Sequence, residues 1–153
     1  MQDLNDLYQE VILDHNRRPR NFGPLPDATQ SAKGHNPLCG DRLTLSLKVE
    51  ADRITGISFE GSGCAISKSS ASLMTDAVKG MTLDEAITLF DRFHLMVTTP
   101  IDEPIDKDAE AAVGKLAVLA GVREFPARVK CASLPWHTLK AAITNAPEPA
   151  KTE

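Results

Sequence analysis

A change of hydrophobic period partway along the chain constrains its fold more than any other feature. Within residues 43–49 apolar and polar side chains alternate, which is the period of a half-buried strand. A turn at residues 51–53 and a second strand-like run over 54–59 follow directly, so an antiparallel hairpin is expected. From Cys64 onward the apolar residues recur at helical spacing instead. We therefore predict an α+β fold in which a small antiparallel β-sheet packs with several α-helices.

The expected helices lie on both sides of this hairpin. They span residues 3–15, 64–80, 82–93 and 108–120, and a last one carries Trp136 to Ile143. Residues 21–34, which are rich in Pro, Gly and small polar types, are expected to form a loop. The serines of the second helix are interpreted as its polar face: Ser67, Ser69, Ser70 and Ser72.

Length and charge narrow the possible classes of protein. A chain of 153 residues without a repeat or linker predicts a single domain over residues 1–146, followed by a disordered tail over 147–153. The net charge of −4 gives no reason to expect nucleic acid or an anionic membrane as a partner. No apolar run approaches the roughly 20 residues of a membrane span, and no leader pattern precedes the first helix. A cytoplasmic location is therefore expected.

Three cysteines and one aspartate are the candidate metal ligands: Cys39, Asp41, Cys64 and Cys131. Thiolates and carboxylates suit zinc, which structural sites hold with four ligands. Gly40 lets the backbone turn between Cys39 and Asp41, so that both can approach one ion. Cys64 follows Gly61-Ser62-Gly63 at an expected strand-to-helix junction, where a helix N-terminus favours the thiolate. An odd cysteine count without a leader also argues for reduced thiols rather than disulfides.

Spacing alone leaves other interpretations open. The chain has no CxxC pair, Cys131 lies far along the sequence from the others, and a lone cysteine is often a buried apolar residue. Asp41 beside Gly40 could simply close a turn. A Cys–His nucleophile pair could use any of the four histidines, His15, His35, His94 and His137. Of these, His94 is interpreted as a packing residue and His137 as an addition to the last helix.

Several separated motifs together resemble the U-type iron–sulfur cluster assembly proteins, the IscU/SufU family with its NifU-like N-terminal domains. The motifs are Tyr8 with Ile12-Leu13-Asp14-His15, Pro19-Arg20-Asn21, Asn36-Pro37-Leu38-Cys39-Gly40-Asp41, Gly61-Ser62-Gly63-Cys64-Ala65-Ile66-Ser67 and Arg128-Val129-Lys130-Cys131-Ala132. The resemblance extends from Leu7 to about Ile143. It implies the α+β fold of that family.

Two features make the chain similar to the SufU branch. IscU-type scaffolds carry a histidine directly before the last cysteine, where this chain has Lys130. The stretch from Leu89 to Phe125 also resembles the insertion that is typical of SufU.

The resemblance to SufU implies a zinc-dependent sulfurtransferase. By that resemblance Cys39, Asp41, Cys64 and Cys131 bind Zn²⁺, and Cys39 also accepts persulfide sulfur from a SufS-type cysteine desulfurase. Arg128 and Lys130 are implied neighbours of the site. A SufBCD-type scaffold complex is the implied recipient downstream. The alternative is a scaffold on which the same cysteines assemble a [2Fe–2S] cluster, with iron in place of zinc.

Overall fold

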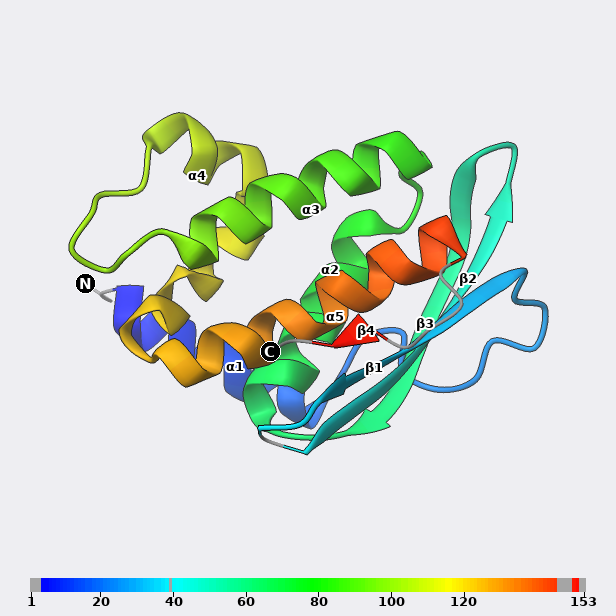
Figure 1. Ribbon diagram of the computed structural model, residues 1–153, viewed down its shortest axis with the longest axis horizontal. Helices are drawn as coiled ribbons and strands as arrows, with labels where there is room; N and C mark the ends of the chain where they lie inside the picture. The colour runs from blue at the N-terminus through cyan, green and yellow to red at the C-terminus, as the bar shows by residue number, and fades with distance from the viewer. Residues whose placement is uncertain (1–3, 39, 146–149, 152–153) are drawn as a thin grey trace.

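The computed structural model describes residues 4–38, 40–145 and 150–151. Its elements in chain order are α1 (Leu4–Arg17), β1 (Gln30–Asn36), β2 (Asp41–Glu50), β3 (Arg53–Ser62), α2 (Ala65–Val78), α3 (Leu83–Thr98), α4 (Lys107–Val113), the 3-10 helix η1 (Gly114–Glu124), α5 (Pro126–Thr144) and β4 (Ala150–Lys151). The predicted α+β class is confirmed: the sheet lies on one side and the helices pack against it (Figure 1). None of the helices in these ranges is long and apolar enough to cross a membrane.

The β2–β3 hairpin forms one side of the sheet, whose strand order is β3-β2-β1-β4. The predicted antiparallel pairing is confirmed, with Leu45 opposite Phe59 and Leu47 opposite Ile57. Ala51 and Asp52 form the turn with φ values of 51° and 60°. Positive φ at both central residues matches the right-handed twist of the flanking strands. The hairpin thus presents one apolar face to the helices.

Strand β1 is a difference from the sequence prediction, which placed a loop over residues 21–34. Its sequence, Gln-Ser-Ala-Lys-Gly-His-Asn, has no apolar alternation, so its pairing with β2 is what keeps it extended. Gly34 lets α5 cross the strand closely, because a Cβ at this position would lie 2.0 Å from Thr138 Oγ1. The strand is therefore defined by tertiary contacts that a local pattern does not encode.

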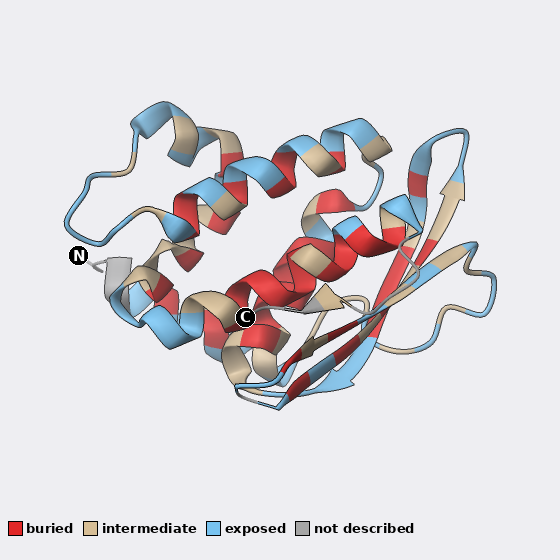
Figure 2. Ribbon diagram, viewed as in Figure 1, coloured by how far each residue is buried: buried red, intermediate tan, exposed pale blue. Residues whose placement is uncertain are grey.

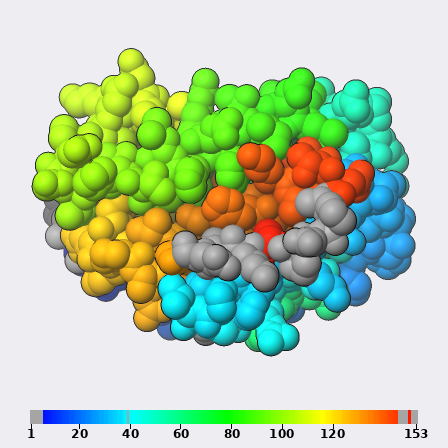
Figure 3. Space-filling view, in the orientation of Figure 1, coloured from blue at the N-terminus to red at the C-terminus, as the bar shows by residue number. Residues whose placement is uncertain are grey.

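Helices α2 and α5 cover the inner face of the sheet, and buried residues concentrate where they meet it (Figure 2). Leu45, Leu47 and Ile54 of the sheet are fully buried, as are Trp136 and Leu139 of α5. The Trp136 ring stacks on Phe93 of α3 with a centroid distance of 4.5 Å. Helix α5 reaches the surface as a band between α3 and β1 (Figure 3). Its largely buried position makes it the axis around which the other elements pack.

The serines predicted to form the polar face of α2 are buried, because this face meets α1 and α5 rather than solvent. Ser69 Oγ donates to the carbonyl of Ile12 at 2.7 Å, and Ser70 Oγ donates to the carbonyl of Ala132 at 2.6 Å. Ser72 Oγ pairs with His15 Nδ1 at 2.7 Å. Small hydroxyl side chains let the helices approach closely while satisfying buried polar groups. Helix α2 is therefore attached to α1 and α5 by hydrogen bonds as well as by apolar packing.

The segment between α3 and α5 is less regular than predicted. The expected helix over 108–120 is divided into α4 and the 3-10 helix η1, which meet at Gly114 with φ of 58°. Arg123 of η1 donates to the carbonyl of Thr99 at 2.8 Å and also to the carbonyls of Pro100 and Glu103. These bonds connect η1 to the end of α3.

Two residues of the predicted tail are described, and they form β4. Ala150 and Lys151 lie parallel to β1, opposite Gly34 and His35. The other positions of the stretch 147–153 lie outside the described residues.

The close approach of Gly34 to α5 predicts a large effect of a single methyl group. Gly34→Ala should lower the free energy of unfolding by about 1–3 kcal/mol, because the Cβ overlaps Thr138 Oγ1. Urea denaturation of the parent and the variant measures this. Thr138→Ala in the Gly34→Ala background should recover part of the loss, with Thr138→Ala alone as the control. A Gly34→Ala protein as stable as the parent would contradict the packing described above.

One buried and one half-buried histidine predict a loss of stability at mildly acidic pH. Burial lowers the pKa of His15, and burial together with the charges of His94 and Lys140 lowers the pKa of His137. The unfolded chain therefore binds more protons below a pH of about 6.5, and the free energy of unfolding should fall as pH drops from there. The carboxylates with lowered pKa act only below a pH of about 4.5, which separates the two effects.

Denaturation curves between pH 7 and 5 check this dependence. His137→Gln should reduce the slope of stability against pH, because glutamine does not titrate. An unchanged slope in this variant would show that His137 does not contribute.

Candidate metal centre

Asp41 is the first residue of β2, and its side chain is fully buried. Its Oδ1 accepts a hydrogen bond from the backbone N–H of Cys64 at 2.8 Å. A buried carboxylate requires such donors or a cation. Gly63 permits the contact, because a Cβ at that position would lie 2.5 Å from Asp41 Oδ1. Gly63 is therefore needed to leave room for the Asp41 carboxylate, in addition to any role at the start of the helix.

Cys64 is the N-cap residue of α2, at the strand-to-helix junction that the sequence predicts. Its Sγ accepts from the backbone N–H of Ser67 at 3.4 Å and lies 3.8 Å from Asp41 Oδ2. The hydrogen bond with the Cys131 thiol, assisted by the N–H groups of Ser67 and Ile66, lowers the pKa of Cys64 to about 6. Burial and the charge of Asp41 oppose this change. The position thus favours a thiolate near neutral pH.

Cys131 is fully buried on α5. The side-chain amide of Asn36 donates to its Sγ at 3.6 Å, and the thiol lies 3.8 Å from the carbonyl of Ala127. Asn36 Oδ1 in turn accepts from the backbone N–H of Leu38 at 3.2 Å. Asn36 therefore connects the Cys131 thiol to the backbone of Leu38.

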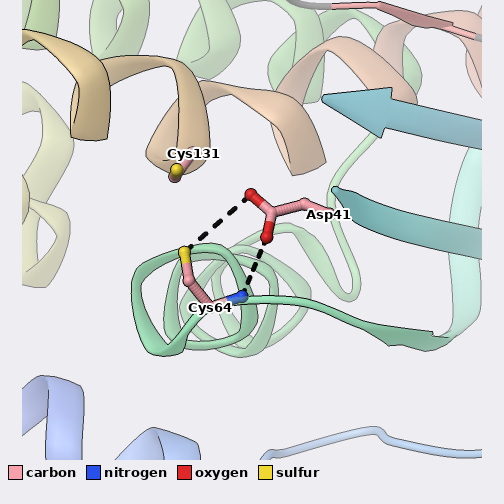
Figure 4. Close-up of side chains that lie close together, drawn as sticks. All are labelled: Asp41, Cys64 and Cys131. Atoms are coloured by element: carbon pink, nitrogen blue, oxygen red, sulfur yellow. Dashed lines mark hydrogen bonds between the residues drawn. The ribbon is translucent and has the colours of Figure 1, made fainter. Parts of the chain in front are cut away.

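The ligand atoms of Asp41, Cys64 and Cys131 all lie within 4.8 Å of one another (Figure 4). They come from a strand and two helices that converge at one end of the sheet. In the described ranges this is the one group of three or more such side chains with metal-binding spacing. Two sulfurs and one carboxylate oxygen fit the donor preferences of zinc and of iron. Cys39, the fourth predicted ligand, lies outside the described residues.

Arg128 is exposed and lies one turn before Cys131 on α5. The negative charge of Cys64 and then that of Cys131 raise the pKa of its guanidinium, which also hydrogen-bonds to both sulfurs. Arg128 is therefore a cation beside both thiols. Lys130, which is next to Cys131 in the sequence, is half-buried.

Three residues near the site belong to motifs of the family resemblance but were given no role at the site from the sequence: Asn36, Gly63 and Tyr8. Tyr8 is buried close to Arg128 and Cys64, and burial raises the pKa of its hydroxyl to about 12. The Gly-Ser-Gly run and the Asn-Pro pair were visible as turn signals, but a turn signal does not name the side chain it serves. Tyr8 was visible as one apolar position of a helix and as part of a resemblance motif, and neither indicates its position beside Arg128 and Cys64.

The histidines are placed away from the three donors where a contact is described. His15 pairs with Ser72, while His94 and His137 pack against Phe90 with centroid distances of 5.8 Å and 5.4 Å. The interpretation of His94 as a packing residue is thus confirmed. His137 is part of the α3–α5 interface rather than an addition to the helix surface.

The fold and the donor set define an α+β protein with a candidate metal site of two thiols and one carboxylate. Residues 7–145 match the family model of the NifU-like N terminal domain, so the chain belongs to this family, whose relatives are named for iron–sulfur cluster assembly. The predicted resemblance to IscU and SufU proteins is confirmed.

Two curated relatives match almost the whole chain. The iron–sulfur cluster assembly scaffold protein IscU of Streptococcus pyogenes serotype M1 is 42% identical, over 94% of this chain and 86% of its own length. The zinc-dependent sulfurtransferase SufU of Bacillus subtilis is 40% identical, over 94% of this chain and 93% of its own.

A solved structure confirms the same fold. The putative iron–sulfur cluster assembly scaffold protein for the SUF system from Fervidobacterium islandicum has a TM-score of 0.79 at 33% identity. The alignment covers 88% of this chain and 94% of that one.

The contact between Gly63 and Asp41 predicts that metal affinity can be changed without altering a ligand. In Gly63→Ala the Cβ displaces Asp41 Oδ1, and the affinity for zinc should fall about 10- to 100-fold. Competition with a chromophoric chelator measures this. Ser62→Ala, one residue earlier and exposed, is the matched control. Equal affinities in the two variants would contradict a role of Asp41 in the centre.

Proposed function

We propose that the protein is a zinc-dependent sulfurtransferase that serves iron–sulfur cluster biogenesis. It accepts persulfide sulfur on Cys39 from a SufS-type cysteine desulfurase. The observation that carries this proposal is the convergence of Asp41, Cys64 and Cys131 within 4.8 Å beside Arg128. We expect it to act in the cytoplasm, where thiols remain reduced.

Cys39 is proposed as the fourth ligand and as the sulfur acceptor. It stands two residues before Asp41 in the sequence, and two residues span at most about 7 Å. Asp41, Cys64 and Cys131 belong to packed elements and are suited to hold an ion. Gly40, with φ of 71°, gives the chain between Cys39 and Asp41 a sharp turn. We therefore assign Asp41, Cys64 and Cys131 to holding the ion and Cys39 to reacting with sulfur.

The proposed transfer is a thiol exchange at a sulfur–sulfur bond. The thiolate of Cys39 attacks the outer sulfur of the desulfurase persulfide, so that a new sulfur–sulfur bond forms on Cys39 as the old one breaks. The desulfurase cysteine leaves as a thiolate, and no external oxidant or reductant is required. Zinc, when bound, keeps its ligand thiols deprotonated at neutral pH. Arg128 lies where its charge would stabilise the anionic sulfurs.

The residue before the last cysteine supports the SufU side of the family, and one of the similar relatives is a SufU protein. Lys130 occupies the position at which the resemblance places histidine in IscU-type scaffolds, and Bacillus subtilis SufU is 40% identical. A SufBCD-type complex is the proposed recipient of the sulfur.

A second candidate function is supported by the other relatives. The Streptococcus pyogenes protein, at 42% identity, is named an IscU scaffold. In that case the cysteines and Asp41 would assemble a [2Fe–2S] cluster as cargo for delivery to other proteins.

The acceptor role predicts the behaviour of a single variant. The parent protein should increase cysteine desulfurase turnover, and Cys39→Ala should leave turnover at the rate of the desulfurase alone. Alanine formation measures turnover, and elemental analysis of the same samples measures zinc. Lys79→Ala, at the end of α2, is a control on the opposite end of that helix from Cys64.

Two results would decide against the proposal. Stimulation by Cys39→Ala equal to that of the parent would exclude Cys39 as the acceptor. Anaerobic reconstitution of a cluster that transfers to an apo-ferredoxin, without any desulfurase stimulation, would favour the scaffold function.

A further inference from the structure

A cavity of about 610 Å³ lies on the outer face of the sheet, the face turned away from α2 and α5. Two cross-strand rows of side chains line it. His35, Arg42 and Ser62 are directly opposite one another on β1, β2 and β3, and so are Lys33, Thr44 and Glu60. The cavity is therefore built on three paired strands rather than on loops.

The charge of this cavity is not neutralised by the protein itself. Lys33 and Arg42 are exposed, and within the described residues neither forms an ion pair. Glu60 is the one acidic residue in the lining. By contrast, Lys48 on the same face of β2 pairs with Asp27 at 2.9 Å and with Glu50 at 3.3 Å. On the outer face, Lys48 is thus paired with carboxylates, whereas Lys33 and Arg42, which lie nearer the candidate metal centre, are not. We call the part of the face around Lys48 the balanced half.

The same strand ends carry the cavity and the candidate metal centre. His35 directly precedes Asn36, Arg42 directly follows Asp41, and Ser62 stands two residues before Cys64. Side chains alternate across a strand, so Asp41 and Asn36 face the helices while Arg42 and His35 face the cavity. A protein that reaches the thiols from this end of the sheet would meet Lys33 and Arg42.

We propose that this cavity docks an acidic segment of the cysteine desulfurase, which deepens and rests on the proposed function. The lining carries two cations, Lys33 and Arg42, and one carboxylate, Glu60, so it is positively charged although the protein as a whole has a net charge of −4. Complementary charges at the rim of an interface steer encounter and fix register. An acidic segment held by Lys33 and Arg42 would orient the persulfide donor toward the end of the sheet where Cys39 enters.

Three charge variants on one sheet face test the proposal. Lys33→Glu should weaken desulfurase binding about three- to tenfold, and Glu60→Lys should strengthen it, because Lys33 and Glu60 share one row. Lys48→Glu changes the net charge of the protein as much as Lys33→Glu but lies in the balanced half, so it should bind as the parent does. Isothermal titration at two salt concentrations measures affinity, with zinc content and thermal melting recorded for each variant.

The outcomes separate this inference from the proposed function. Equal weakening by Lys33→Glu and Lys48→Glu, or no effect of either, would overturn the docking site while leaving desulfurase stimulation by the parent intact. Binding that depends on Lys33 and Glu60 without any stimulation would support the docking site and refute the sulfurtransferase. Failure of the parent to bind the desulfurase would overturn both.

Discussion

The hydrogen bond from the Cys64 backbone to the buried Asp41 carboxylate is the contact on which the functional end of the molecule depends. It joins the first residue of β2 to the N-cap of α2, and so fixes the sheet against the helix that supplies a thiol. A buried carboxylate with too few donors is unstable, which makes this position demand either hydrogen bonds or a cation. Gly63 is required because any side chain there would occupy the carboxylate's space. The packing of the buried carboxylate and the binding of a metal ion would therefore both require Asp41, Gly63 and Cys64.

The thiols are surrounded by groups that favour negative charge on sulfur. Cys64 receives backbone N–H groups at the start of a helix, and Cys131 receives the amide of Asn36. Arg128 adds a full positive charge near both. Because these donors belong to different elements, the charge on the sulfurs is stabilised only in the folded chain. Folding and ligand deprotonation are therefore coupled.

Local patterns were sufficient for elements whose periodicity matches their burial. The β2–β3 hairpin and the helix starting after Cys64 were predictable because their apolar faces repeat regularly. Strand β1 was not, because its pairing with β2 rather than its own pattern keeps it extended. The buried serines of α2 were not either, because hydrogen bonds to residues more than 50 positions away determine their burial. At the site, Cys64 and Asp41 could be placed at turns, whereas the approach of Cys131 depends on how α5 crosses the sheet. Only the family resemblance anticipated that approach.

Arg123 has a mechanical consequence for the segment between α3 and α5. Its guanidinium binds the carbonyls of Thr99, Pro100 and Glu103, so the chain leaving α3 is fastened to η1. Gly121 of the same η1 packs directly against the ring of Tyr8 on α1. The exposed chain between Glu103 and the start of η1 is covalently continuous. The contacts of Arg123 and Gly121, however, are what hold the end of α3, η1 and α1 together. A protease that cut the exposed chain would nick the protein without releasing either end.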